Sequence, residues 1–201
     1  MKNLLYGVST QEILNSYDKF KITSTVLNKH TLLESNSKLL MSENGIALKY
    51  LQNAYTASID LVYIDPPFAS NNIFTVSDER SNTVSRTKSG KVAYSDVFLL
   101  EDYLEFIKTR LVLIRELMSE QGSIYLHIDY KVGHYVKIIM DEVFGLKNFR
   151  NDITRVKCNP KNFSRRAYGN VKDVILFYTK SNNYIWNDVT SEMTASSIDN
   201  S

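Results

Sequence analysis

Four consecutive residues, Asp65-Pro66-Pro67-Phe68, have the groups that chemistry on an aromatic amine requires. The Asp65 carboxylate accepts hydrogen bonds, and the Pro66 carbonyl is an acceptor on a residue that carries no N–H. Proline fixes the backbone, so both acceptors are held rigidly. Two acceptors aimed at one point can hold both hydrogens of an amino group out of the ring plane, which makes the nitrogen nucleophilic. The Phe68 ring can stack on the same base.

A base in a duplex reaches such a pocket only after it has left the stack. The tetrad therefore has the groups for methylating an amino nitrogen of a flipped base, and the alternative is a rigid turn capped by Asp65. Residues 59–64, directly before it, form a short apolar run rich in β-formers. In open α/β sheets, ligands bind beyond the carboxyl ends of the strands, which is where Asp65 would lie.

The segments around the tetrad alternate between strand and helix patterns. Residues 59–64 predict a strand buried on both faces of a parallel sheet. Residues 100–119 predict a helix, and Gly122 fits the turn that would end it. The apolar residues of that helix are spaced four and three apart, as on one helical face: Leu100, Leu104, Ile107, Leu111, Ile114 and Met118.

A second strand and a second helix follow. Residues 123–129 predict another buried strand, and residues 131–144 predict a helix with Gly145 just beyond its end. Crossovers of this length are typical of an α/β fold, a parallel sheet with flanking helices. Residues 69–95 lack periodicity, and a loop of this length in a compact domain is a functional lid or a disordered insertion. Residues 151–158 and 171–179 predict two further strands.

Three pieces of the sequence, in this order, resemble the motifs of one enzyme family. Residues 60–68, DLVYIDPPF, are similar to the catalytic motif of the DNA amino-methyltransferases, in the form common in their β-class. That class includes the modification subunits of type III restriction systems. Residues 122–129, GSIYLHID, resemble its second motif, and residues 141–149, DEVFGLKNF, resemble the run that follows. The chain is thus identified as similar to the amino-terminal portion of such an enzyme.

The resemblance implies a Rossmann-like S-adenosylmethionine-dependent methyltransferase fold and a role for each residue of the tetrad. Asp65 would accept from the target amino group with its side chain, and Pro66 would accept with its main-chain carbonyl. Phe68 would stack on the flipped base, and Pro67 would hold the turn. Asp at the first position, in place of Ser, favours adenine N6 over cytosine N4 in this family.

The resemblance also implies S-adenosylmethionine as cofactor, with four candidate residues for its site. Besides Asp65, Asn44 lies where the family often has a G-D-N-like turn near the cofactor. His127 and Asp129 end the second predicted strand and are expected to point into the same cleft. They would shape the pocket or contact the cofactor, and a hydrogen-bonded core histidine and a capping aspartate are equally good readings. One cysteine, Cys158, and three histidines give no metal-ligand cluster.

The basic residues of the chain are concentrated toward its carboxyl end. Residues 147–180 hold nine Lys or Arg and two Asp or Glu, whereas the whole chain has a net charge of +2. Family order places the start of the target-recognition region here, although a solvated basic face is the alternative. The candidates for contacts with DNA phosphates are Arg155, Lys157, Lys161, Arg165 and Arg166.

These observations divide the chain into three parts. Residues 1–40 form a helical or irregular segment, residues 41–150 the methyltransferase catalytic region, and residues 151–201 the start of the target-recognition region. In the β-class the glycine-rich F-x-G-x-G cofactor loop comes after these parts, and this sequence contains no G-x-G. We therefore expect an incomplete fold that binds S-adenosylmethionine poorly and turns over little or not at all alone.

The function predicted by the resemblance is methyl transfer from S-adenosylmethionine to adenine N6 in duplex DNA, within a restriction-modification system. N4-cytosine specificity and a truncated, non-catalytic DNA-binding or subunit remnant stay open as alternatives. Methylation of an RNA or protein amide is disfavoured, because those relatives usually carry Asn in place of Asp65. The implied partners are double-stranded DNA, a restriction subunit or a downstream methyltransferase half, and a second copy of the chain.

The composition, 43% hydrophobic and 23% charged, is ordinary for a soluble globular protein. A single cysteine excludes an internal disulfide, and residues 1–20 lack the pattern of a signal peptide. No apolar run approaches the ~18 residues of a membrane span. We expect a cytoplasmic protein with no membrane partner.

Overall fold

The computed structural model describes residues 9–18, 39–67, 73–76, 84–85, 91–95, 100–157, 166 and 171–188. The elements in chain order are α1 (Thr10–Asp18), α2 (Asn44–Tyr55), β1 (Ile59–Ile64), β2 (Ile73–Val76), β3 (Val84–Ser85), β4 (Lys91–Ser95), α3 (Leu100–Leu117), β5 (Met118–Asp129), α4 (Gly133–Phe144), a 3-10 turn (Leu146–Asn148), β6 (Phe149–Val156) and β7 (Lys172–Thr179).

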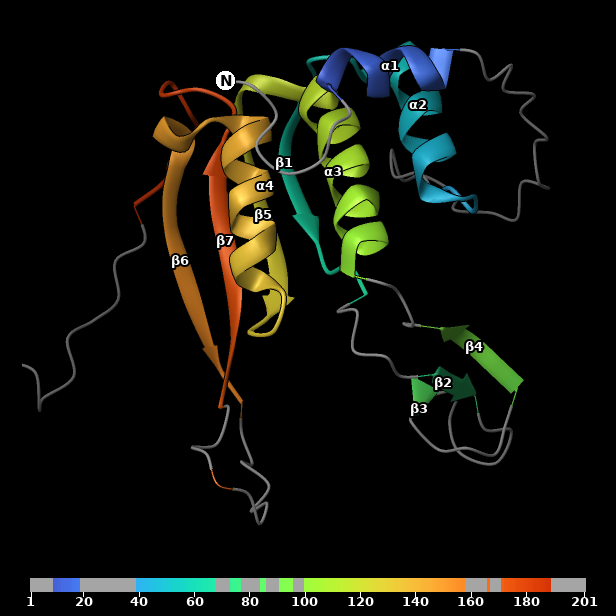
Figure 1. The fold of residues 1–201 in the computed structure, drawn as a ribbon. Coiled ribbons are helices and arrows are strands. Elements are labelled where there is room, and N and C mark those ends of the chain that lie inside the picture. Colours follow the sequence, from blue (N-terminus) through green and yellow to red (C-terminus); the bar gives the residue numbers. More distant parts are fainter. Residues whose placement is uncertain are drawn as a thin grey trace, which may run out of the picture.

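The main sheet has four strands in the order β1-β5-β7-β6, with α3 and α4 packed against one face (Figure 1). The α/β fold predicted from the sequence is therefore confirmed. The prediction of a parallel sheet is correct only for β1 and β5, since β7 runs antiparallel to both of its neighbours. For β6 and β7 the direction follows from their connection: the Lys157 N–H donates to the Val171 carbonyl (2.7 Å), so the chain returns beside itself and the two strands pair antiparallel.

The core lies between this sheet and the two helices. β5 sends alternate side chains to opposite faces of the sheet, as every strand does. Ile124, Leu126 and Ile128 face the helices and are fully buried there. They pack with apolar residues of the helices and of β7: Leu104, Ile107, Leu111, Val136, Ile139, Met140, Leu176 and Tyr178.

The prediction that residues 59–64 are buried on both faces is wrong. β1 is the edge strand of the main sheet, and Leu61 and Tyr63 are 64% and 60% exposed on the face away from the helices. Val62 and Ile64 pack against the core on the other face. The continuous apolar pattern is that of a central strand, but within the described residues β5 alone pairs with β1.

The expected turn at Gly122 is also corrected. α3 ends at Leu117 and the chain passes directly into β5, so Gly122 lies inside a strand. A Cβ atom on Gly122 would lie 2.8 Å from the Ile59 carbonyl oxygen, so glycine is required by the close approach of two backbones. The register between β1 and β5 shifts at the same place, between Ile59 and Leu61.

The long segment after the tetrad contains regular structure that the sequence did not indicate. β2, β3 and β4 form a second, antiparallel sheet in the order β3-β2-β4. The short β-forming runs Ile73–Val76 and Lys91–Ser95 lie within mostly polar sequence, which hides their pattern. The remainder of residues 69–95 lies outside the described residues, and a lid function there stays a prediction.

The two predicted helices are confirmed with small shifts of their ends. α3 buries four of the six predicted apolar residues as one stripe: Leu104, Ile107, Leu111 and Ile114. α4 begins at Gly133 and is followed by Gly145, whose φ of 92° suits a glycine. No helix in the described ranges is long and apolar enough to cross a membrane.

Candidate active site at the carboxyl edge of the sheet

Asp65 follows the last residue of β1 and lies at the edge of the sheet where β1 and β5 both end. Ile64, the last residue of β1, pairs with Leu126, so Asp65 falls beside His127. The Asp65 Oδ1 atom lies 3.1 Å from Nδ1 of His127. The Asp65 side chain is 56% exposed, which leaves it accessible to a ligand.

A cavity of about 390 Å³ opens between α2, α3 and the end of β1. The structure brings Asn44, Asp65, Pro66 and Pro67 together in its wall. Phe68, the last residue of the tetrad, lies outside the described residues. The rest of the lining is mostly apolar: Leu48, Tyr63, Ile64, Phe106, Ile107, Arg110, Leu111 and Ile114. A mostly apolar wall with a few polar groups is the usual composition of a small-molecule site.

Arg110 is the cation of this cavity, and its position is fixed by neighbours from α2. Its Nε donates to Asn44 Oδ1 (2.9 Å), and its guanidinium pairs with Glu43. Glu43 also accepts the Ile46 N–H (2.9 Å) and so caps α2. Partial burial raises the pKa of Glu43, but the N–H groups at the start of α2 and the Arg110 guanidinium together hold it below its ordinary value. Sequence reasoning missed Arg110, since nothing in its spacing marks it.

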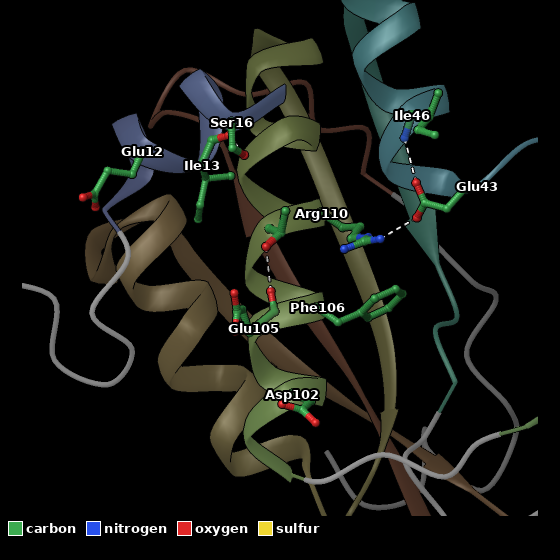
Figure 2. Close-up of a pocket in the computed structure, with 10 residues that line it drawn as sticks. Glu12, Ile13, Ser16, Glu43, Ile46, Asp102, Glu105, Phe106 and Arg110 are labelled. Carbon is green, nitrogen blue, oxygen red and sulfur yellow. Dashed lines mark hydrogen bonds and ion pairs between the residues drawn. The ribbon is translucent and has the colours of Figure 1, made fainter. Parts of the chain in front are cut away.

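A second, larger and more open cavity of about 810 Å³ lies between α1, α2 and α3 (Figure 2). It shares Phe106 and Arg110 with the first cavity, so the two adjoin along α3. Its wall carries the carboxylates of Glu12, Glu43, Asp102 and Glu105. This acidic wall does not suit a nucleic-acid phosphate.

His127 and Asp129, the two candidate residues at the end of β5, have different contacts in the structure. His127 is buried on the face away from the helices and lies against Asp65, although it does not line the 390 Å³ cavity. Asp129 is buried as well, and its Oδ1 accepts the Lys131 N–H (2.9 Å) in the turn that leads to α4. The observed hydrogen bond of Asp129 is thus that of a turn-capping residue.

Two of the five basic residues predicted to contact DNA form ion pairs with one buried carboxylate, Asp173, that sequence reasoning missed. Asp173, at the start of β7, is 2% exposed. Its Oδ2 lies 3.1 Å from Arg155, and its Oδ1 lies 2.5 Å from Lys157. Arg166 is exposed, and Lys161 and Arg165 lie outside the described residues. The available signal for Asp173 was an acidic residue in an otherwise apolar strand within the most basic part of the chain.

Comparisons with known proteins agree on one family. A family model described as DNA methylase matches residues 59–200. The chain is 35% identical over 167 residues to the type II methyltransferase M.EcaI of Enterobacter cloacae, covering 83% of this chain and 34% of that protein. It is 29% identical over 166 residues to the Mod subunit of the type III restriction-modification enzyme EcoP15I of Escherichia coli, covering 73% of this chain and 24% of that protein.

Solved structures similar to this chain include an M1.HpyAVI–SAM complex, with a TM-score of 0.47 and 17% identity over 77% of this chain and 60% of that one. The chain spans about a quarter to a third of the length of the two curated relatives described above.

Proposed function

Because the chain belongs to the DNA methylase family, we propose that Asp65, Pro66 and Pro67 form the amino-group site of a restriction-modification DNA methyltransferase. The reaction proposed is methyl transfer from S-adenosylmethionine to adenine N6 in duplex DNA. One observation carries the proposal: the first three residues of the tetrad lie in the wall of a cavity at the carboxyl edge of the sheet.

The geometry of Asp65 suits an amino group as the target. Its carboxylate is accessible and is held from behind by His127, so one oxygen remains available to accept an N–H from a base in the cavity. The Pro66 carbonyl is the second acceptor on the same wall. When the nitrogen takes a methyl group it gains positive charge, which a fixed carboxylate stabilises.

The residues of the cavity also suit S-adenosylmethionine, which supplies an electrophilic methyl group when bound. A volume of about 390 Å³ lies within the range of small-molecule sites. Asp65 offers a negative charge to a cationic ligand, and Asn44, the first residue of α2, offers a side-chain amide. Leu48, Phe106 and Ile107 provide an apolar wall for a flat ring. The Arg110 charge is offset by Glu43 and so does not repel a cation.

Adenine as the target base rests on Asp65 at the first position of the tetrad. Cytosine N4 remains the second candidate for the same site. The proposed partners are duplex DNA and a restriction subunit, since one relative is a type III Mod subunit. The assignment of residues 151–201 to target recognition, the DNA contacts of Arg155, Lys157 and Arg166, the homodimer and the cytoplasmic location stay predictions.

A methyl-transfer assay on unmethylated duplex DNA tests this function. Radiolabelled S-adenosylmethionine is supplied to the chain alone and to the chain complemented in trans with an F-x-G-x-G half from a curated relative. Asp65→Ala is expected to lower the rate by about a hundredfold or more, because the carboxylate stabilises charge that develops in the transition state.

The matched control is Asp152→Asn, an exposed acidic residue on β6. Digestion of the product to nucleosides distinguishes N6-methyladenine from N4-methylcytosine. Equal rates for the wild type and Asp65→Ala would contradict the assigned role of the carboxylate.

A further inference from the structure

Four polar side chains form a row across the main sheet, three of them on strands and one directly after a strand. Asp65 follows β1, His127 lies on β5, Asp173 on β7 and Arg155 on β6. The strand registers place them on one face. His127 pairs with Ile175, two residues from Asp173, and Asp173 pairs with Arg155. Their neighbours with the opposite alternation, such as Leu126 and Leu176, point into the helix-covered core, so the row lies on the other face.

The His127 ring lies between two carboxylates, one within hydrogen-bond distance and one farther away. His127 Nδ1 lies 3.1 Å from the Asp65 carboxylate, and His127 Nε2 lies 3.5 Å from Asp173 Oδ2. A neutral imidazole donates from one nitrogen only, and the partners of the ring decide which one. The Nδ1 distance is within hydrogen-bond reach, so Nδ1 is the nitrogen that donates to Asp65, and Nε2 makes no hydrogen bond with Asp173.

Asp173 is held in place by two basic side chains. A buried carboxylate is costly unless it is paired, and here Arg155 and Lys157 each approach one of its oxygens. Asp173 also pairs directly with Asp129 across the β5–β7 ladder, and both carboxylates are buried. The two basic side chains offset the repulsion between these acids. Held on both oxygens, Asp173 cannot rotate freely, so it presents a constant surface to the imidazole.

Asp65, at the other end of the row, is exposed to solvent. It lies beyond an edge strand with an exposed carboxylate, and among the described residues His127 is the side chain with an ion-pair contact to it. The hydrogen-bond contact of the buried His127 ring is thus with an accessible carboxylate in the cavity wall.

We infer that His127 is a positioning residue for the Asp65 carboxylate: its Nδ1–H holds Asp65 where the carboxylate can accept an amino N–H. This inference rests on the proposed function of Asp65. It assigns to His127 a contact with the catalytic carboxylate, where the sequence left open a part in shaping the pocket, a cofactor contact or a core histidine.

The first test measures the geometry in the 201-residue chain without any turnover. Long-range ¹H–¹⁵N spectra report the ring nitrogens of the three histidines, and His127→Asn identifies the His127 signals by their loss. Asp65→Asn is expected to shift the Nδ1 signal of His127, because it replaces the carboxylate that accepts from Nδ1. Asp152→Asn is the control and should leave that signal unchanged. An unchanged Nδ1 signal in Asp65→Asn would overturn the inference.

The second test measures the functional consequence in the complemented enzyme and uses two variants of similar polarity. Asn places its amide nitrogen near the Nδ1 position of histidine, whereas Gln places it near Nε2. His127→Asn should therefore keep kcat within about threefold, while His127→Gln should lower it about a hundredfold with KM for DNA unchanged, since a small misplacement of a reacting group has effects of that size.

Thermal melts of both variants monitor folding, because both remove the same buried ring. Equal kcat for the Asn and Gln variants, or a loss confined to KM, would contradict positioning. An Asp65→Ala enzyme with wild-type rate would instead refute the proposed function, while the spectra would still report whether the row exists.

Discussion

The two faces of the main sheet are built from alternate residues of the same strands, yet they differ in kind. On the helix-covered face, β5 contributes Ile124, Leu126 and Ile128, all with no exposed surface. On the other face it contributes Tyr125, His127 and Asp129. The first face stabilises the fold, and the second carries every charged residue of the row that leads to Asp65. Because successive side chains of a strand point to opposite faces, β5 can contribute apolar residues to the core and polar residues to the site at the same time.

The largest effect expected from this comparison is on stability. Leu126→Ala removes a fully buried side chain from the helix-covered face and should cost about 2–5 kcal/mol in free energy of unfolding. Leu61→Ala, on the other face of β1, removes a side chain that is 64% exposed and should change it by about 0.5 kcal/mol or less. Urea unfolding followed by circular dichroism measures both. Similar losses for the two variants would mean that the second face is covered in solution.

The helices α3 and α4 and the strands of the main sheet could be predicted from the sequence because their signals are local, unlike the short strands β2, β3 and β4. The apolar spacing of α3 and the glycine after α4 are both contained within their own segments. The edge position of β1 and the antiparallel direction of β7 could not be predicted in this way, because they depend on which strands become neighbours. Gly122 was misassigned for the same reason: the backbone that forbids a side chain there belongs to Ile59, in another strand.

Tyr178 is a polar group buried on the packing face, and it should link stability to alkaline pH. Burial raises the pKa of its phenol, and the hydrogen bond to Asp141 (2.7 Å) raises it further. A raised folded-state pKa means that the stabilisation is complete below the unfolded value, about pH 10, and is lost as the pH rises above it.

Tyr178→Phe therefore tests the packing face at two pH values. At neutral pH the variant should lose about 1.5 kcal/mol in free energy of unfolding, the size of one hydrogen bond to a charged acceptor. Between about pH 8 and about pH 11 its stability should fall less steeply than that of the wild type, since the unfolded variant has one fewer phenol to ionise. Urea unfolding at the two pH values measures both slopes, and parallel slopes would contradict the assignment to Tyr178.

The candidate site was predictable only in part. The tetrad and Asn44 were marked by sequence motifs, and the structure brings Asn44, Asp65, Pro66 and Pro67 to one cavity. Asp173 was missed because its contact with His127 depends on the register between β5 and β7, which a single sequence does not display. A charged residue inside an apolar strand is a usable signal, since burial of an unpaired carboxylate is costly and a partner must exist.

The smallest effect is expected at the aromatic group on the second face, next to β7. Trp186, the single tryptophan of the chain, stacks on Phe177 with ring centroids 6.1 Å apart, and Phe177 stacks on Tyr125 at 4.4 Å. Trp186 is 59% exposed, so Trp186→Ala should cost only about 0.5–1 kcal/mol in free energy of unfolding. Because its emission reports this face alone, iodide should quench Trp186 in the folded chain almost as efficiently as in urea. Strong protection from iodide would show that another surface covers the second face in solution. The two faces would then not differ in exposure as they do in this structure.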